Sequence, residues 1–281
     1  LPMITSCSPG WVNFVEKTYP DLLPHVSSCK SPQQMFGAIA KTYYADKMGI
    51  PRDKMFVVSI MPCIAKKYEC QRPEMNASGY QDVDCVLTTR ELAKMIRIAG
   101  LSFDALPEEE FDHPLGLGSG AGAIFGTSGG VMEAAIRTVY EVVTGKEPQS
   151  LDFTACRGHE GIKEATLDLD GTPVKVAITN GLKNARVLME KIRAGEADYQ
   201  FIEVMCCPGG CIGGGGQPFR TTAAIRAHRM DGLYKVDKSL PLRQSHKNPD
   251  IQTLYKEFLH EPNSHLAHEL LHTHYTDRSG K

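Results

Sequence analysis

The chain has 281 residues and a formal net charge of −2 at pH 7, a length that suits one large domain or two small ones. A charge this near zero gives no support to a nucleic-acid partner, and no apolar run approaches the roughly 18 to 20 residues of a membrane span. The nine cysteines are an odd number and unevenly spread, which favours metal ligation in the reduced cytoplasm over a secreted disulfide scaffold.

Predicted strands and helices alternate along the chain. The opening "LPMITSC" lacks an initiator Met and reads as a strand that enters a cysteine motif, so we expect that an N-terminal part is missing. Apolar runs predict a short buried strand at Met55–Ile60 and further strands at Pro173–Thr179 and Gln200–Val204. Capping residues and terminal glycines predict helices over residues 31–48, 88–100, 129–145 and 181–195. The acidic stretch 107–114 reads as a surface loop.

This alternation predicts an α/β fold with largely parallel sheets. Three cysteine segments follow strand-like runs: "TSCSPGW" near the start, "MPC" after residues 55–60 and "MCCPGGC" after residues 200–204. Open α/β sheets bind ligands beyond the carboxyl ends of their strands, so the three segments are expected to converge on one crevice.

Cys207 and Cys211 form a tight group that lies far along the chain from Cys63. This spacing suits an iron–sulfur cluster, which takes thiolates from several directions, better than structural zinc, which usually uses two tight pairs. The glycines after Cys211 allow close approach of the backbone to a large inorganic group. Buried free thiols beside a glycine turn are the alternative. Core packing is the expectation for four isolated cysteines: Cys29, Cys70, Cys85 and Cys156.

Three long segments carry a family resemblance. "TSCSPGWVNFVEKTYP", "MPCIAKKYECQRPE" and "EVMCCPGGCIGGGGQP" are similar, in the same order, to the three signature segments of the [FeFe]-hydrogenases. "SPQQMFGAIAKTYY", "TTRELAKMI" and "SGAGAIFGTSGGVMEAA" also resemble that family, so the similarity runs through most of the chain. The resemblance implies that residues 1–281 are the catalytic domain without its upstream part. It further implies two lobes of mostly parallel sheet flanked by helices, with the active site in the crevice between them.

The resemblance also implies a cofactor and a reaction. A [4Fe–4S] cubane is joined through one cysteine to a di-iron unit with CO, cyanide and azadithiolate ligands, which together form the H-cluster. The enzyme reversibly forms H₂ from protons, with ferredoxin or an electron-transfer subunit as carrier, and maturation factors assemble the site. Matched by motif position, Cys63, Cys207 and Cys211 are cubane ligands, and Cys211 is the bridge.

The neighbours of these cysteines match the family's pocket. Lys66 is placed to donate a charged hydrogen bond to one cyanide. Glu69 matches an acidic residue whose expected role is a structural ion pair. The other matched wall positions are Ser31 and Pro32 beside the second cyanide, Gln33 next to them, the apolar Met61 and Met205, and Phe125 with Gly126.

Two residues match the family's proton relay. Cys7 matches the thiol that exchanges a proton with the bridging amine, and Ser27 matches a hydroxyl further along. The acidic residues that complete the relay are expected upstream of this chain.

One position departs from the family pattern. The common first motif has two adjacent cysteines, the second of which ligates the cubane, and here that position is Ser8. A serine alkoxide is a harder and more basic ligand than a thiolate. Ser8 itself, Cys7, or Cys206 in the extra "CC" of the third motif are the candidates for the vacant corner.

Two other classes of function are open. A non-catalytic, hydrogenase-like factor of cytosolic cluster assembly shares the fold, but Lys66, Met61, Met205 and "SPQQ" argue against it. An H₂ sensor is the second alternative, which Ser8 leaves open. "HELLH" (His268–His272) fits a zinc protease helix but leaves little chain for a third ligand, and it reads as a capped C-terminal helix. "GGGG" lacks the Lys of a phosphate loop, and His159 reads as a packing histidine.

Overall fold

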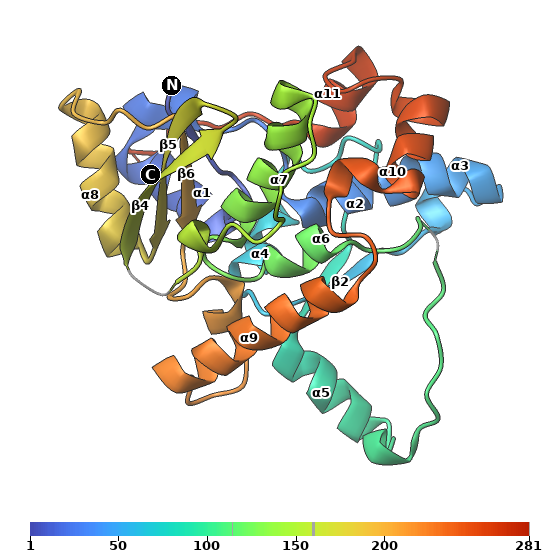
Figure 1. Ribbon diagram of the computed structural model, residues 1–281. Coiled ribbons are helices and arrows are strands. Elements are labelled where there is room, and N and C mark those ends of the chain that lie inside the picture. Colours follow the sequence, from blue (N-terminus) through green and yellow to red (C-terminus); the bar gives the residue numbers. More distant parts are fainter. Residues whose placement is uncertain (114, 159–160, 281) are drawn as a thin grey trace.

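The computed structural model describes residues 1–113, 115–158 and 161–280 and contains two β-sheets whose strands are mostly parallel (Figure 1). The larger sheet has the strand order β1 (Met3–Ile4), β6 (Phe201–Met205), β5 (Thr172–Asn180) and β4 (Ile162–Leu169). Its pairs are parallel except for β4, which lies antiparallel to β5 at the edge. The smaller sheet pairs β2 (Val58–Met61) with β3 (Cys85–Thr88) in parallel. The predicted α/β fold with mostly parallel sheets is confirmed.

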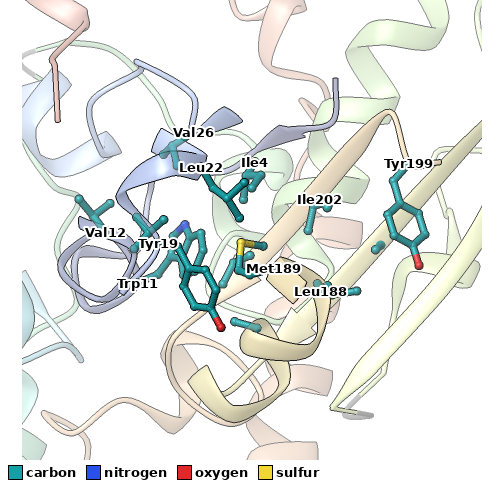
Figure 2. Close-up of a cluster of buried hydrophobic side chains, with 14 residues drawn as sticks. Ile4, Trp11, Val12, Tyr19, Leu22, Val26, Leu188, Met189, Tyr199 and Ile202 are labelled. Atoms are coloured by element: carbon teal, nitrogen blue, oxygen red, sulfur yellow. The ribbon is translucent and has the colours of Figure 1, made fainter. Parts of the chain in front are cut away.

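Helices cover both faces of the larger sheet. On one face, α1 (Pro9–Thr18) and α8 (Leu182–Arg193) bury Trp11, Leu188 and Met189 against Ile4 and Ile202 (Figure 2). On the other face, α7 (Gly130–Thr144) packs its apolar side against β5 and β4. Successive residues of β5 therefore point into two different apolar clusters, which is why this strand reads as a continuous apolar run.

The smaller sheet corrects one expectation. The segment predicted as a buried strand forms β2 only from Val58 onward, and Val58 and Ile60 are 46% and 42% exposed. In the part of the chain that the structure describes, this sheet is packed on one face, where Val57 and Met61 contact Val83 and Val86. Apolar composition signals a strand that can be buried on both sides, and here only one side is covered.

The predicted helices are present with small changes. The helix expected over residues 31–48 forms as α2 (Pro32–Ile39), a π-helical turn (Ala40–Tyr44) and α3 (Ala45–Met48). Thr88 caps α5 (Thr89–Ile98) through a capping box with Glu91, as the Thr start signal predicts. The described residues 107–113 are an exposed loop. The sequence reading did not identify β4 or the long helix α9 (Ala223–Ser239).

The C-terminal segment of the chain packs against its N-terminal half. Helix α9 lies beside α6 (Gly120–Ile124), and α10 (Pro249–Leu254) and α11 (His265–Leu271) lie beside α2 and α3 (Figure 1). Beyond α11, a β-bridge joins Cys29 to His272, and the N–H of Arg278 donates to the carbonyl of Glu16 at 2.9 Å. No helix among the described residues is both long enough and apolar enough to cross a membrane.

Candidate metal centre

The second and third cysteine motifs touch through glycine backbone. The N–H of Gly216 donates to the carbonyl of Pro62 at 2.9 Å, and a Cβ on Gly214 would lie 2.1 Å from the same oxygen. Such an approach is closed to any residue with a side chain. Cys63 is therefore held next to the loop that carries Cys207 and Cys211.

The loop between α6 and α7 braces Cys211 from another side. Gly210 has φ of +93°, and a Cβ there would lie 2.7 Å from the backbone nitrogen of Ser128. The N–H of Ile212 donates to the carbonyl of Gly126 at 3.0 Å. Phe125 and Gly126, which were expected to form a wall of the site, thus lie in the segment that contacts the third motif.

The first motif completes the convergence. β1 pairs with β6, so residues 5–8 and 206–211 leave the sheet at the same edge. The Ser8 hydroxyl accepts a hydrogen bond from the N–H of Cys206 at 3.2 Å, and Lys66 Nζ donates to the carbonyl of Cys7 at 3.3 Å. All three cysteine segments therefore meet at one place.

A buried polar network stands beside the thiols. Lys66 Nζ donates to Glu69 Oε2 at 3.1 Å, and the same carboxylate accepts from Ser31 Oγ at 2.8 Å and from Gln33 Nε2 at 3.2 Å. The four residues are 2 to 6% exposed. Glu69 thus has the ion pair expected of it. Ser31 precedes α2 in the N-cap position, but its side chain bonds Glu69 instead of the helix.

Gln33 in this network and Gln34 next to it in sequence carry side-chain amide atoms without a partner. Gln33 Oε1 and both Gln34 side-chain amide atoms are buried and unbonded among the described residues. Lys66 uses two of its three N–H donors on protein acceptors. Unmet buried polar atoms are costly, so a polar ligand at this place would be stabilised.

The thiols sit in different electrostatic surroundings. Burial raises the pKa of Cys7 to about 12 and that of Cys211 to about 11, and it also raises the pKa of Cys63. Cys63 and Cys207 both contribute to the raised pKa of Cys211, so these three sulfurs share one neighbourhood. Hydrogen bonding with the Cys206 thiol lowers the pKa of Cys207 to about 7.

Glu203 is a site neighbour that the sequence reading missed. It is fully buried in β6, where its carboxylate accepts from the N–H groups of Gly129 at 2.6 Å and Met132 at 2.8 Å at the start of α7. Burial raises its pKa to about 7. A lone acid inside the apolar run "FIEVM" was the available signal, since buried acids are rare unless partnered.

The remaining expected residues are placed as follows. Met205 is 2% exposed, whereas Met61 is half-buried and Pro32 is exposed. Ser27 Oγ accepts from the N–H of Cys29 at 3.3 Å, and among the described residues no hydrogen bond joins it to Cys7.

The structure also places the four isolated cysteines and the "HELLH" motif. Cys70 and Cys156 are buried as expected, while Cys29 and Cys85 are only half-buried. "HELLH" covers the end of α11, which Ser264 caps, and the tilted rings of His268 and His272 have centroids 4.2 Å apart. Within the described ranges, no three His, Cys, Asp or Glu side chains are arranged to hold a single metal ion. His159 lies outside the described residues.

Comparisons with known proteins identify the family. The chain belongs to the family described as iron only hydrogenase large subunit, C-terminal domain, which matches residues 1–215. Residues 223–278 match a second family, the iron hydrogenase small subunit. Residues 1–281, which are expected to form one domain, are thus matched by two family models.

Individual relatives agree with the family. The chain is 53% identical over 279 residues to a subunit of an NADP-reducing hydrogenase from Solidesulfovibrio fructosivorans, covering 99% of this chain and 48% of the relative. It superimposes on the [FeFe]-hydrogenase HydA1 from Chlamydomonas reinhardtii (variant E141Q) with a TM-score of 0.84 and 46% identity, covering 100% of this chain and 77% of that one. The chain spans about half the length of the curated hydrogenases it matches.

A relative with lower sequence identity is not named as a hydrogenase. The chain is 34% identical to the protein NAR1 of Arabidopsis thaliana over 293 aligned positions, covering 98% of this chain and 61% of that protein. Identities of 44 to 55% to hydrogenases support an oxidoreductase that uses iron and sulfur.

Proposed function

We propose that this chain is the catalytic part of an [FeFe]-hydrogenase, which interconverts two protons and two electrons with one molecule of H₂. When bound, the H-cluster supplies the redox-active iron at which the H–H bond is made or broken. The observation that carries the proposal is the meeting of three far-apart cysteine segments beside a buried lysine and unpartnered amide atoms.

The cysteines hold the cluster. Cys63, Cys207 and Cys211 are the proposed cubane ligands, and Cys211 is the proposed bridge to the di-iron unit. The glycine contacts of Gly216 and Gly210 fix the backbone on both sides of this group. The position of the fourth ligand, where Ser8 replaces the family's cysteine, is taken up below.

The side chains around the cysteines orient diatomic ligands and exclude water. Lys66 has one N–H donor left for an anionic cyanide, and Glu69 holds its ammonium group in place. Ser31 and Gln33 are fixed by the same carboxylate. The apolar surfaces of Met61, Met205 and Phe125, with Gly126, form the rest of the wall, and Pro32 continues it toward the surface.

Cys7 moves the proton. Burial, and after it the charge of Cys211, raises the pKa of its thiol to about 12, so Cys7 carries a proton at neutral pH. Ser27 is the proposed next station. Electrons come from ferredoxin or an electron-transfer subunit, maturation factors load the site, and we place the reaction in the cytoplasm.

Infrared spectroscopy and H₂ evolution test this function. The full-length protein is matured with a synthetic di-iron complex and assayed with a chemical reductant. We expect CO and CN bands together with H₂ evolution. A protein that carries a cubane but shows neither the bands nor H₂ would be a non-catalytic iron–sulfur protein, the class that the 34% relationship to NAR1 favours. Bands with very slow turnover would favour the H₂ sensor.

A further inference from the structure

Ser8 and Cys206 lie next to each other at the edge of the sheet. The hydroxyl of Ser8 accepts a hydrogen bond from the backbone N–H of Cys206 at 3.2 Å. Ser8 occupies the N-cap position of α1, yet its side chain makes no bond to that helix. One of its two oxygen lone pairs is therefore already used to position the backbone of Cys206.

The sulfur of Cys206 fits into a space that a glycine leaves open. A Cβ added to Gly10 in the first turn of α1 would lie 2.7 Å from Cys206 Sγ and 3.3 Å from its Cβ. The thiol thus points toward the first motif, against Gly10, which is two residues after Ser8.

The surroundings of the sulfur place it with the cubane ligands. Hydrogen bonding to the Cys207 thiol raises the pKa of Cys206, followed by burial and by the charges of Cys207 and Cys63. Two adjacent residues in an extended strand would point to opposite sides, but β6 ends at Met205, so Cys206 and Cys207 lie beyond the strand and are not held to that alternation.

Cys7 faces a different group. Burial is the main cause of its raised pKa, and the charged neighbours that act on it are Cys211, Glu203, Lys66 and Glu69. The largest of these charge effects on Cys7 comes from Cys211, the proposed bridge, whereas the charges that act on Cys206 are those of Cys207 and Cys63.

We propose that Cys206 Sγ is the fourth protein ligand of the [4Fe–4S] cubane, and that Ser8 is a positioning residue that holds the backbone of Cys206. The proposal rests on the proposed function, because it presupposes the cubane. A thiolate is the softer ligand and matches iron–sulfur iron better than a serine alkoxide. The cysteine lost from the first motif is in effect supplied by the third.

Chemical reconstitution with iron and sulfide tests the ligand before any di-iron unit is added. The full-length protein and its Cys206→Ala and Ser8→Ala variants are compared by iron and sulfide content and by the EPR spectrum of the reduced cubane. We expect Cys206→Ala to lose about one to four iron atoms per chain and at least tenfold of the cubane signal. Ser8→Ala should keep most of the iron, because the Cys206 thiol is still present, but its EPR spectrum should broaden, because the backbone of Cys206 is no longer held.

Two further variants secure the interpretation. Cys156→Ala removes a buried thiol outside the site and should leave the cubane unchanged, which controls for loss of folding. Ser8→Cys combined with Cys206→Ala should restore the iron content by returning the ligand to the first motif. The proposal is overturned if Cys206→Ala keeps the parent spectrum, or if Ser8→Ala loses the cubane while Cys206→Ala retains it. A parent protein that takes up no cubane would refute the proposed function as well, whereas a parent with a cubane but no H₂ refutes only the enzyme.

Discussion

At the scale of single residues, the proposed metal centre contains residues with a structural role and one residue, Cys7, with a proposed role in proton transfer. Lys66, Glu69 and Ser31 form a chain of short polar contacts, all buried, so each is fixed by its neighbours. Cys7 joins this network through its backbone carbonyl, which accepts a hydrogen bond from Lys66. A change at its sulfur therefore leaves that hydrogen bond in place.

We predict that Cys7→Ala separates cluster binding from turnover. The variant should keep the cubane and the CO and CN infrared bands, because its sulfur is not a proposed ligand. H₂ evolution should fall by about 10² to 10⁴-fold, the usual contribution of a positioned proton donor. Unchanged H₂ evolution would remove Cys7 from the relay, and loss of the cubane would make it a ligand.

Gly210 shows how much the third motif depends on a missing side chain. In Gly210→Ala the φ of +93° with a ψ of −157°, a region almost confined to glycine, costs about 1 to 3 kcal/mol, and the new Cβ also collides with the backbone of residues 126–128. Gly195→Ala is the control for a positive φ without a collision, because its φ is +72° and nothing lies within 4 Å of the new Cβ. Urea unfolding should show a larger loss for Gly210→Ala than for Gly195→Ala. Equal losses would mean that the loop adjusts freely.

At the level of elements, helices α7 and α9 are joined by buried charge. Arg137 is fully buried, donates to both carboxylate oxygens of Asp237 at 2.8 Å, and also donates to Glu133 at 2.9 Å. Arg243 and Arg157 extend the network to Asp152. Helix α9 belongs to the part that matches the small-subunit family, so these ion pairs connect the two matched segments.

Breaking this junction should be costly. Arg137→Met leaves Asp237 and Glu133 buried without their shared partner, and we expect the free energy of unfolding to fall by about 3 to 5 kcal/mol. Lys146→Ala removes an exposed ion pair with Asp170 and should leave the free energy of unfolding almost unchanged. Denaturant unfolding measures both. A small loss in Arg137→Met would mean that Arg243 and Arg157 compensate.

At the scale of the whole molecule, the free energy of unfolding should decrease at acidic pH. Burial by itself favours the neutral form of the Glu16 and Asp237 carboxyl groups. Hydrogen bonds from Arg72 nevertheless lower the pKa of Glu16 from its ordinary value of 4.5. Hydrogen bonds from Arg137 and Arg243 likewise lower the pKa of Asp237 from its ordinary value of 3.8. Their contribution is complete above those unfolded values and is lost as pH falls through the lower folded ones. The thermal midpoint should therefore drop below about pH 4.5. Glu16→Gln should be less stable at pH 7 and decline less steeply in acid, and a parallel decline would contradict the assignment.

The cysteine motifs could be predicted from the sequence, but the contacts that hold them in place could not. "MPC" and "MCCPGGC" follow strands, so their meeting could be predicted from the rule that ligands bind at strand ends. The contact of Ser8 with Cys206 could not, because it depends on the register of β1 against β6, which is set by side-chain packing over a long sequence separation. Val58 and Ile60 were expected to be buried because composition cannot tell which face of a small sheet is covered. The return of the C-terminal segment has no local signal at all.

That return has a consequence for biosynthesis. β1 pairs with β6 in the larger sheet, and residues 27–30 exchange hydrogen bonds with residues 271–275, among them Tyr275 Oη to the carbonyl of Ser27 at 2.6 Å. A nascent chain that has emerged from the ribosome only through residue 200 lacks the β6 strand beside β1 and the segment that holds residues 27–30. Under the proposed function, metal loading therefore follows translation of both segments, and a product clipped before them would carry its first cysteines without that support.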